Sequence, residues 1–491
     1  MALLQNESPR IQFEYAPLSK SQRISLVWPI AYCCFCFVPG FSLRIAERRI
    51  STQAAYFSVD VFFCEILALF LPGIYAPLLL SICMFFDFVS GIVSTYYFRP
   101  QDIPYVTRSL FLLPFDRLAR YGIVALLMVT LLGTINYLLR KAVNRRMRYK
   151  TARVLFLVTL ILVSIDVWNR YRIYRDPDTV RMVLLRFPEM TLAKRWLFAV
   201  KQPSSGHGLA EQYSDSASER GLALLGNLSS RPDIVEILVE SWGDDQGTIT
   251  TKLEENYRTS AIARRYDVVT GTVPFWGPTV SGEVRELCHS TFGLNILHRN
   301  VQPPENCIPS VLAKKGYSTE AVHGYFGKMF DRSRWYPLIG FEKMSFKDAL
   351  HKQGLSDCTG RYAFPGVCDR QISTWIGNQL AQAKGLEFIY WVTLNSHLPV
   401  PPTANGLNPA PCNFDSQVSN EQSLCSWFKL EYEVHQSIAD MVERPDLPPT
   451  AFFVVGDHAP PFVDTGIRDR FSNSRVPFVL LIPKQVIKKQ G

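Results

Sequence analysis

A threonine between a turn and a helix is the first residue of this sequence whose position suggests chemistry. Residues 271–278 are rich in Gly and Pro, which predicts a turn, and a helix is predicted from Val280. Thr279 then has the place of an N-cap residue, and Glu283 suits the positive helix end. A hydroxyl there faces free N–H groups that bind phosphate or stabilise an alkoxide. The same pattern is typical of an ordinary capped helix, so other residues must decide.

Polar side chains that follow apolar runs are the second group of interest. Each run is of buried-strand type, and the residues concerned are Glu240 after 234–239, His397 after 388–394, and Asp457 with His458 after 450–455. Because ligand sites of parallel sheets lie beyond the carboxyl ends of the strands, we expect these side chains to converge on one sheet edge.

Three of these residues are a suitable ligand set for a metal ion. Glu240, Asp457 and His458 offer oxygen and nitrogen ligands for one divalent ion, with Zn²⁺ or Mn²⁺ favoured and Mg²⁺ possible. The Thr279 hydroxyl would take an open position, where the metal lowers its pKa and makes it a nucleophile. An arginine would be needed to neutralise phosphoryl oxygens.

The elements that must position these residues belong to an α/β domain, which we place at residues 226–491. A helix is predicted at Ser310–Lys315, followed by a strand that ends at His323, and a further strand at Phe478–Ile482. Strands that alternate with helices predict a mostly parallel sheet with helices on both faces.

The first third of the 491-residue chain is different, because its apolar residues are crowded together. Five candidate membrane spans are Ile24–Leu43, Ala54–Ile74, Leu78–Tyr97, Tyr121–Leu139 and Val154–Trp168. We therefore predict a cytoplasmic N-terminus at 1–23, a transmembrane domain of five helices at 24–169, and a juxtamembrane connector at 170–225.

Charge predicts the orientation of these spans. Residues 140–153 hold seven Lys and Arg and no acid, which makes this loop cytoplasmic and everything after Trp168 extracytoplasmic. Basic residues at 44–49 and 170–175 count mildly against this topology. Much of the net charge of +9 lies in such short loops, so it does not indicate a nucleic-acid partner. Asp60, Glu65 and Asp87 fall within spans, where they would contact a headgroup ammonium or another helix.

The cysteines agree with an extracytoplasmic domain. Of the eleven, five lie in apolar segments and six in the polar part, and an even number there suits disulfides in an oxidising compartment. Proximity in sequence suggests the pairs Cys288–Cys307, Cys358–Cys368 and Cys412–Cys425, although six cysteines allow fifteen pairings.

The order of five motifs makes the chain recognisable. They are ILVESWG at 237–243, GPTVSGE at 277–283, GYSTEAVHG at 316–324 with FDRSRWYPLIGF at 330–341, NSHLP at 395–399 and VVGDHAP at 454–460. The chain resembles membrane-anchored phosphotransferases of the alkaline phosphatase/sulfatase superfamily. These are the lipoteichoic acid synthases, the phosphoglycerol transferases of osmoregulated glucans and the phosphoethanolamine transferases.

The resemblance implies a fold and a site. It implies five N-terminal spans and an extracytoplasmic alkaline phosphatase-like α/β domain, with Thr279 as nucleophile and Glu240, Thr279, Asp457 and His458 at the metal. It also implies that Arg332 and His397 bind substrate, with Arg334 as a near competitor of Arg332. Three other histidines are interpreted as structural: His289, His323 and His435.

The implied reaction is transfer of a phospho-headgroup through a covalent phosphothreonine. The donor would be phosphatidylethanolamine or phosphatidylglycerol, the acceptor an envelope glycan, and the location the inner membrane of a Gram-negative bacterium with the catalytic domain in the periplasm. A phosphodiesterase or sulfatase-type hydrolase and a glycan-binding membrane protein without activity remain as alternatives. The C/S-x-P-x-R motif of sulfatases proper is absent, which disfavours sulfate-ester hydrolysis.

Overall fold

The computed structural model describes most of residues 214–484, with gaps at 227–229, 292–295, 298–301, 359–363, 399, 401–411 and 463. Upstream it describes mainly 57–71, 78–83 and 145–175, with single positions such as Tyr97. The chain forms two compact units. One comprises residues 1–46, 54–88 and 123–189, and the other 47–53, 89–122 and 190–491.

The second unit is built on a seven-stranded sheet. Its strands are β3 Asp233–Val239, β4 Tyr266–Pro274, β5 Tyr317–His323, β6 Lys343–Ser345, β7 Leu386–Val392, β8 Thr450–Gly456 and β9 Arg475–Pro483. The spatial order is β4-β9-β8-β3-β7-β5-β6. Pairing from β8 through β3, β7 and β5 to β6 is parallel, whereas β9 runs antiparallel to both β8 and β4.

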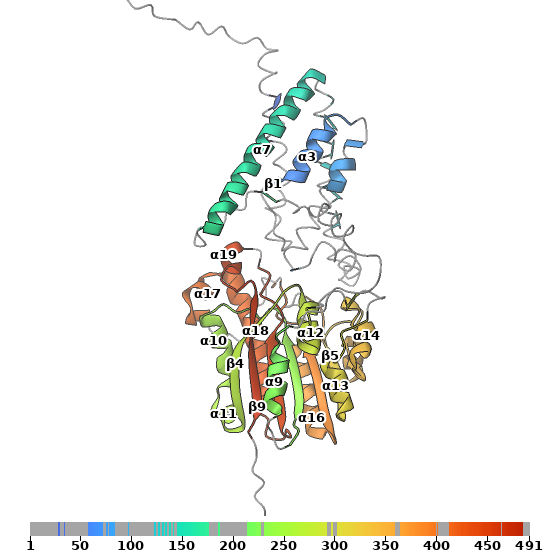
Figure 1. Ribbon diagram of the computed structural model, residues 1–491, viewed down its shortest axis with the longest axis vertical. Coiled ribbons are helices and arrows are strands. Elements are labelled where there is room, and N and C mark those ends of the chain that lie inside the picture. The colour runs from blue at the N-terminus through green and yellow to red at the C-terminus, as the bar shows by residue number, and fades with distance from the viewer. Residues whose placement is uncertain are drawn as a thin grey trace, which may run out of the picture. The chain divides into compact units, whose positions relative to one another are not determined.

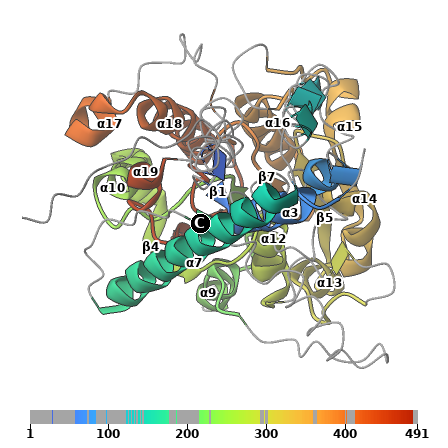
Figure 2. The ribbon, with the colours of Figure 1, turned by 90° about the horizontal axis from the view of Figure 1, so that it is seen from above.

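Helices cover both faces of this sheet. Figure 2 shows α16 and α18 on one face and α9 and α13 on the other. The helices of this unit are α9 Ala217–Leu225, α10 Thr248–Glu254, α11 Ser260–Arg265, α12 Thr279–Cys288, α13 Ile308–Lys314, α14 Arg332–Trp335, α15 Lys347–Lys352, α16 Asp369–Gln382, α17 Ser416–Asn420, α18 Gln422–Val442 and α19 Thr465–Arg468. Because both faces are covered, every residue of β3 and of β8 is buried, as expected for central parallel strands.

The predicted strands and the mostly parallel sheet are confirmed, but one local prediction is wrong. Residues 271–274 do not form a turn, because they complete the edge strand β4, which pairs with β9 along its whole length. Its alternating burial is that of an edge strand rather than of a buried run, and the turn is confined to 275–278.

The three disulfides join the cysteines that are neighbours in sequence: Cys288–Cys307, Cys358–Cys368 and Cys412–Cys425. This outcome confirms the pairing suggested by spacing. The helix α9 lies in the same unit, where Ala217 joins the main core.

The first unit contains α3 Val59–Ala68 and α7 Arg145–Arg175, which contact each other (Figure 1), and a short parallel pair of β1 Phe57–Ser58 with β2 Leu185–Arg186. Many large apolar side chains here are exposed, among them Phe63, Leu126, Phe156, Leu157 and Ile161. Among the described residues, we find no helix with the length and apolar character needed to span a membrane. The first predicted span lies almost entirely outside the described residues, and the second, third and fourth lie partly outside them.

Candidate active site

The predicted metal ligands lie together at the carboxyl edge of the two central strands. Glu240 follows β3, and Asp457 and His458 follow its neighbour β8. One ligand atom from each of the three residues lies within 4.8 Å of the others, and all three side chains are buried.

Hydrogen bonds to Asp457 leave one of its oxygens facing this cluster. Its Oδ1 accepts the N–H groups of Ser241 at 2.7 Å and His458 at 2.6 Å. Its Oδ2 is buried and has no hydrogen-bond partner among the described residues, and His458 Nε2 lies 3.2 Å away. Ser241 adopts a positive φ of 63° to bring its N–H to Asp457, a strained backbone of the kind found at functional sites.

His458 is oriented so that one ring nitrogen can ligate a metal. Its Nδ1 donates to the carbonyl of Ala459 at 3.0 Å, which leaves the lone pair on Nε2. Nε2 lies 3.6 Å from Glu240 Oε1. A buried carboxylate oxygen without a partner beside a pinned imidazole is the donor set that a divalent ion prefers, so the residues fit the expected metal.

Thr279 reaches this cluster from the first turn of α12. Its Oγ1 donates to Glu240 Oε2 at 3.2 Å. The prediction that Thr279 is an N-cap is wrong, because Pro278 occupies the N-cap and Thr279 is the first helical residue. Pro278 lacks an N–H and sets an extended entry, and the threonine hydroxyl is directed to a carboxylate from another strand instead of to its own helix.

Two glycines allow α12 to approach so closely. Gly277 has a φ of +70°, which favours glycine at the turn before the helix. A Cβ on Gly282 would lie 3.1 Å from both Cα and Cβ of Asp457. The helix therefore packs backbone-on-backbone against the end of β8, and this contact places Thr279 at the ligands.

The two carboxyl groups of the cluster titrate in opposite directions. Burial and the negative charge of Glu240 raise the pKa of Asp457. Burial alone would raise the pKa of Glu240, but His397 and His458 outweigh it and lower that pKa. A bound cation would stabilise both groups in their ionised form.

His397 lies beside the same cluster. Its Nδ1 donates to the carbonyl of Leu398, which leaves the lone pair on Nε2, and Nε2 lies 3.9 Å from Glu240 Oε1. Burial lowers the pKa of His397, although Glu240 opposes this shift. The imidazole is therefore neutral near pH 7 and able to accept a proton.

Arg332 is engaged by a carboxylate. Its Nε donates to Glu283 at 3.0 Å and its Nη2 at 2.6 Å, and Tyr336 also donates to Glu283, at 2.5 Å. Glu283, interpreted from sequence as a residue that suits the helix end, instead links α12 to α14. The remaining nitrogen of this guanidinium, Nη1, takes no part in the hydrogen bonds to Glu283. Arg334 donates to the carbonyl of Ile296.

Two further residues near the site lie outside the set predicted from the sequence, in which His323 is interpreted as structural. His323 donates from Nδ1 to the carbonyl of Val392 at 2.9 Å, and burial together with the charges of Arg332 and His397 lowers its pKa. His323 therefore lies near both predicted substrate-binding residues, Arg332 and His397. Arg468 lies close enough to His458 to contribute to lowering the pKa of that histidine, after the larger effect of burial. His323 ends β5 within the motif at 316–324, but that motif indicates no role for it, and no recognised motif contains Arg468.

His289 and His435 fit their structural interpretation. His289 Nδ1 lies 2.7 Å from Ser216 Oγ, and His435 Nδ1 lies 2.7 Å from the hydroxyl of Tyr257. Burial lowers the pKa of His435 to about 3, so this core imidazole is neutral.

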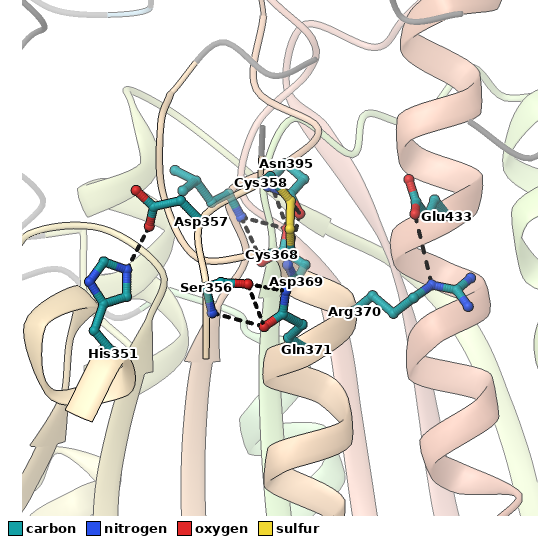
Figure 3. Close-up of a disulfide and its surroundings, with 11 residues drawn as sticks. His351, Ser356, Asp357, Cys358, Cys368, Asp369, Arg370, Gln371, Asn395 and Glu433 are labelled. Atoms are coloured by element: carbon teal, nitrogen blue, oxygen red, sulfur yellow. Dashed lines mark hydrogen bonds and ion pairs between the residues drawn. A yellow bond between two sulfur atoms is a disulfide. The ribbon is translucent and has the colours of Figure 1, made fainter. Parts of the chain in front are cut away.

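The loop that carries His397 is supported by α16 (Figure 3). Asp369, the first residue of α16, accepts the backbone N–H groups of Leu394 and Asn395 at 2.9 and 2.7 Å. In return, the side chain of Asn395 accepts the N–H of Asp369 at 2.7 Å. The disulfide Cys358–Cys368 ends next to Asp369, so it closes the loop that leads into this support.

Comparison with known proteins gives one family match. Residues 232–490, just over half of the chain, match the family model described as Sulfatase. This region contains all six predicted site residues. No curated protein sequence matches the chain.

Solved structures give weaker likenesses. The lipoteichoic acid synthase LtaP from Listeria monocytogenes is 14% identical with a TM-score of 0.37, and the match covers 55% of this chain and 72% of that one. The Streptococcus pyogenes phosphoglycerol transferase GacH in complex with sn-glycerol-1-phosphate is also 14% identical, with a TM-score of 0.37. That match covers 55% of this chain and 78% of that one. The zinc complex of the C-terminal periplasmic domain of EcEptC from Escherichia coli is 12% identical, with a TM-score of 0.34. That match covers 52% of this chain and 73% of that one. These TM-scores are low, so the family assignment rests on the sulfatase match.

Proposed function

The chain belongs to the sulfatase family, and from this premise we propose that it is a metal-dependent phosphotransferase. It transfers the phospho-headgroup of a membrane phospholipid, phosphoethanolamine or phosphoglycerol, to a hydroxyl of an envelope glycan. The transfer proceeds through a covalent phosphothreonine on Thr279. A zinc or manganese ion is the expected cofactor, with magnesium as a further option.

One observation carries this proposal. The hydroxyl of Thr279 lies at a buried ligand set in which Asp457 Oδ2 has no hydrogen-bond partner among the described residues and His458 Nε2 bears a lone pair. A metal bound by Glu240, Asp457 and His458 would lower the pKa of the threonine hydroxyl and neutralise charge on the phosphoryl group.

In the first step, Thr279 Oγ1 forms a bond to the headgroup phosphorus, and the bond from phosphorus to the diacylglycerol oxygen breaks. The threonine hydroxyl loses one proton and the diacylglycerol oxygen gains one. His397 Nε2, which carries a lone pair beside Glu240, accepts the first proton and returns it to the leaving oxygen.

In the second step, a glycan hydroxyl forms a bond to the same phosphorus and the bond to Thr279 Oγ1 breaks. His397 takes the proton of the glycan hydroxyl and returns it to the threonine oxygen. Arg332, fixed on Glu283 through Nε and Nη2, presents Nη1 to a phosphoryl oxygen.

The proposal includes a location in the bacterial inner membrane, with several spans and the catalytic domain in the periplasm. Three disulfides support an oxidising compartment. Exposed apolar side chains on α3 and α7, such as Phe63 and Phe156, support contact of the first unit with lipid. A membrane location would bring the donor lipid to the enzyme.

The test is mass spectrometry of the full chain purified from its native membrane. We expect a phosphoethanolamine or phosphoglycerol adduct on the peptide that contains Thr279, and the mass identifies the donor. Thr279→Ala should lose the adduct and transfer to glycan, whereas Thr374→Ala, which changes an exposed threonine of α16, should keep both.

Other outcomes would support the alternatives. Release of free phospho-headgroup at the same rate with and without glycan would indicate a hydrolase that uses water as acceptor. A bare Thr279 after incubation with both lipids and metal, together with full tolerance of Asp457→Ala, would contradict catalysis and favour a binding protein.

A further inference from the structure

Arg468 is a cation near the predicted metal ligand His458 and lies outside the set predicted from sequence. Arg468, the last residue of α19, has its guanidinium carbon 4.8 Å from the centroid of the Tyr97 ring. The Tyr97 ring lies 5.4 Å from the imidazole of His458. Tyr97 therefore contacts both Arg468 and a predicted metal ligand.

Tyr97 is fixed in this position by packing and by its backbone. Its ring meets Phe275 edge-on at a centroid distance of 5.6 Å, and its φ is +61°. Its carbonyl oxygen would lie 3.9 Å from a Cβ on Gly277, so it borders the turn before Thr279. Tyr97 belongs to the same compact unit as the sheet, although it lies well before the segment that matches the family.

The three arginines around the site differ in how far their side chains are exposed to solvent. Arg285 and Arg332 are 1% and 2% exposed, and their guanidinium groups donate to buried carboxylates, Glu286 and Glu283 respectively. Arg468 is partly exposed. After the larger effect of burial, Arg468 and Arg285 both contribute to lowering the pKa of His458, and Arg332 contributes to lowering that of His323.

We propose that Arg468, held against the face of Tyr97, binds a phosphate oxygen of the donor lipid beside His458, and that Tyr97 is the residue that positions it. A guanidinium presents several N–H donors in one plane and suits a phosphate, and stacking on an aromatic ring restricts that plane. Arg468 is thus a specificity residue for the phosphate ester, separate from Arg332. The inference rests on the proposed function.

The first experiment measures transfer by the full chain with phosphatidylethanolamine and phosphatidylglycerol in mixed micelles. Arg468→Gln should raise KM for the donor about tenfold or more, because a charge-assisted hydrogen bond is lost, with a smaller change in kcat. Arg231→Gln is the matched control. Arg231 is exposed and precedes β3, so it lies at the opposite edge of the sheet, and its KM should equal that of the wild type.

Tyr97 variants separate positioning from folding. Tyr97→Phe keeps the ring but removes the hydroxyl that is hydrogen-bonded to Arg468, so it should raise KM less than Tyr97→Leu does. Tyr97→Leu should raise KM in the wild-type background but add little in the Arg468→Gln background, because both changes act through one guanidinium. Full additivity of the two effects would contradict the positioning role.

The second experiment titrates inorganic phosphate into the same purified proteins by calorimetry, with the metal they carry. Arg468→Gln should lower the phosphate affinity about tenfold. An affinity within about twofold of the wild type, or no phosphate binding by the wild type, overturns the inference. Loss of phosphate affinity with an unchanged lipid KM would assign the site to a free anion and overturn the lipid assignment. If the wild type transfers neither lipid, the proposed function fails, and the calorimetry still decides whether Arg468 binds phosphate.

Discussion

At the residue scale, three histidines at the sheet edge share one arrangement. His323, His397 and His458 each donate from Nδ1 to a backbone carbonyl, so each retains its lone pair on Nε2. Burial lowers the pKa of all three, which keeps them neutral. These backbone hydrogen bonds set the tautomer of each imidazole, so no second carboxylate is needed to orient the rings. The site therefore offers nitrogen lone pairs to a metal or a proton.

Asp457→Asn should remove the metal. The amide oxygen can still accept the N–H groups of Ser241 and His458, but the negative charge on the atom that replaces Oδ2 is gone. We expect metal affinity to fall at least about 100-fold, because loss of a residue that only hydrogen-bonds to a metal ligand already lowers metal affinity by up to about 100-fold. Metal analysis by mass spectrometry checks this.

A matched control is Asp446→Asn, since Asp446 is exposed and pairs with Arg444. A chelator should lower the melting temperature of the wild type and of this control but leave that of Asp457→Asn unchanged. Equal metal content in the wild type and Asp457→Asn would contradict the ligand assignment.

Asp369 should make stability depend on pH. Burial raises its pKa from 3.8 to about 7. Because the folded state then holds the proton more tightly than the unfolded state, the stability due to the protonated group is complete below about pH 4 and is lost as pH rises through about 7. The melting temperature of the wild type should therefore fall between about pH 5 and about pH 8 relative to that of Asp369→Asn. A constant difference between the two proteins across this range would contradict the assignment.

The ligand residues could be predicted from sequence because each follows a buried strand, and such strands end at one edge. The hydrogen-bond partners of the site residues could not be predicted from sequence. Thr279 donates to Glu240, which is 39 positions away, and Arg332 donates to Glu283, which is 49 positions away. These contacts depend on the packing of α12 and α14, and no local pattern records it. Arg468 was missed for the same reason.

At the element scale, α12 is the helix that places the proposed nucleophile beside the proposed metal ligands. It is buried along its whole length, and Arg285 fixes it by donating to the carbonyl of Gly456 at 2.7 Å. The close contact of Gly282 with Asp457 then sets the distance from Thr279 to the ligands. The edge strand β4 leads into this helix, and its last residues, 271–274, are predicted from sequence as a turn because the strand is defined by its pairing with β9.

Gly282→Ala should impair catalysis more than stability. The added Cβ would lie 3.1 Å from backbone and side-chain atoms of Asp457, so the helix must shift by a few tenths of an ångström. Small misplacements of reacting groups lower rates by about 100-fold, whereas alanine favours a helix by about 1 kcal/mol relative to glycine.

Single-turnover transfer rates and thermal melts of the full chain measure both effects. Gly385→Ala is the control, because its Cβ would meet nothing within 4 Å. Wild-type rates in Gly282→Ala would show that the close approach is not needed.

At the scale of the whole molecule, the two units differ in what they expose. Exposed large apolar residues are concentrated in the first unit, at positions such as Leu126, Leu127 and Leu131, while the second unit buries a continuous core around its sheet. Apolar surface of this extent needs a cover, and lipid would provide it.

Cell fractionation tests this expectation. The full chain should stay with the membrane after an alkaline carbonate wash. Protease added to the outside of spheroplasts should cut the connector predicted at 170–225, while the basic loop at 140–153 should stay protected until the membrane is broken. Release of the chain by carbonate, or cleavage of the basic loop in intact spheroplasts, would contradict the proposed topology.

The order of the strands also has a consequence for how the protein is made. β3 is the first sheet strand to be synthesised, yet its neighbours β7 and β8 begin at Leu386 and Thr450. The bond from Ser241 to Asp457 spans 216 positions. Both edges of β3 therefore stay unpaired until β7 is made, and one of them until β8 is made, and unpaired edges are open to aggregation. The proposed ligand set is complete only after β8 and the two residues that follow it have been made, so the proposed metal would be bound late in folding.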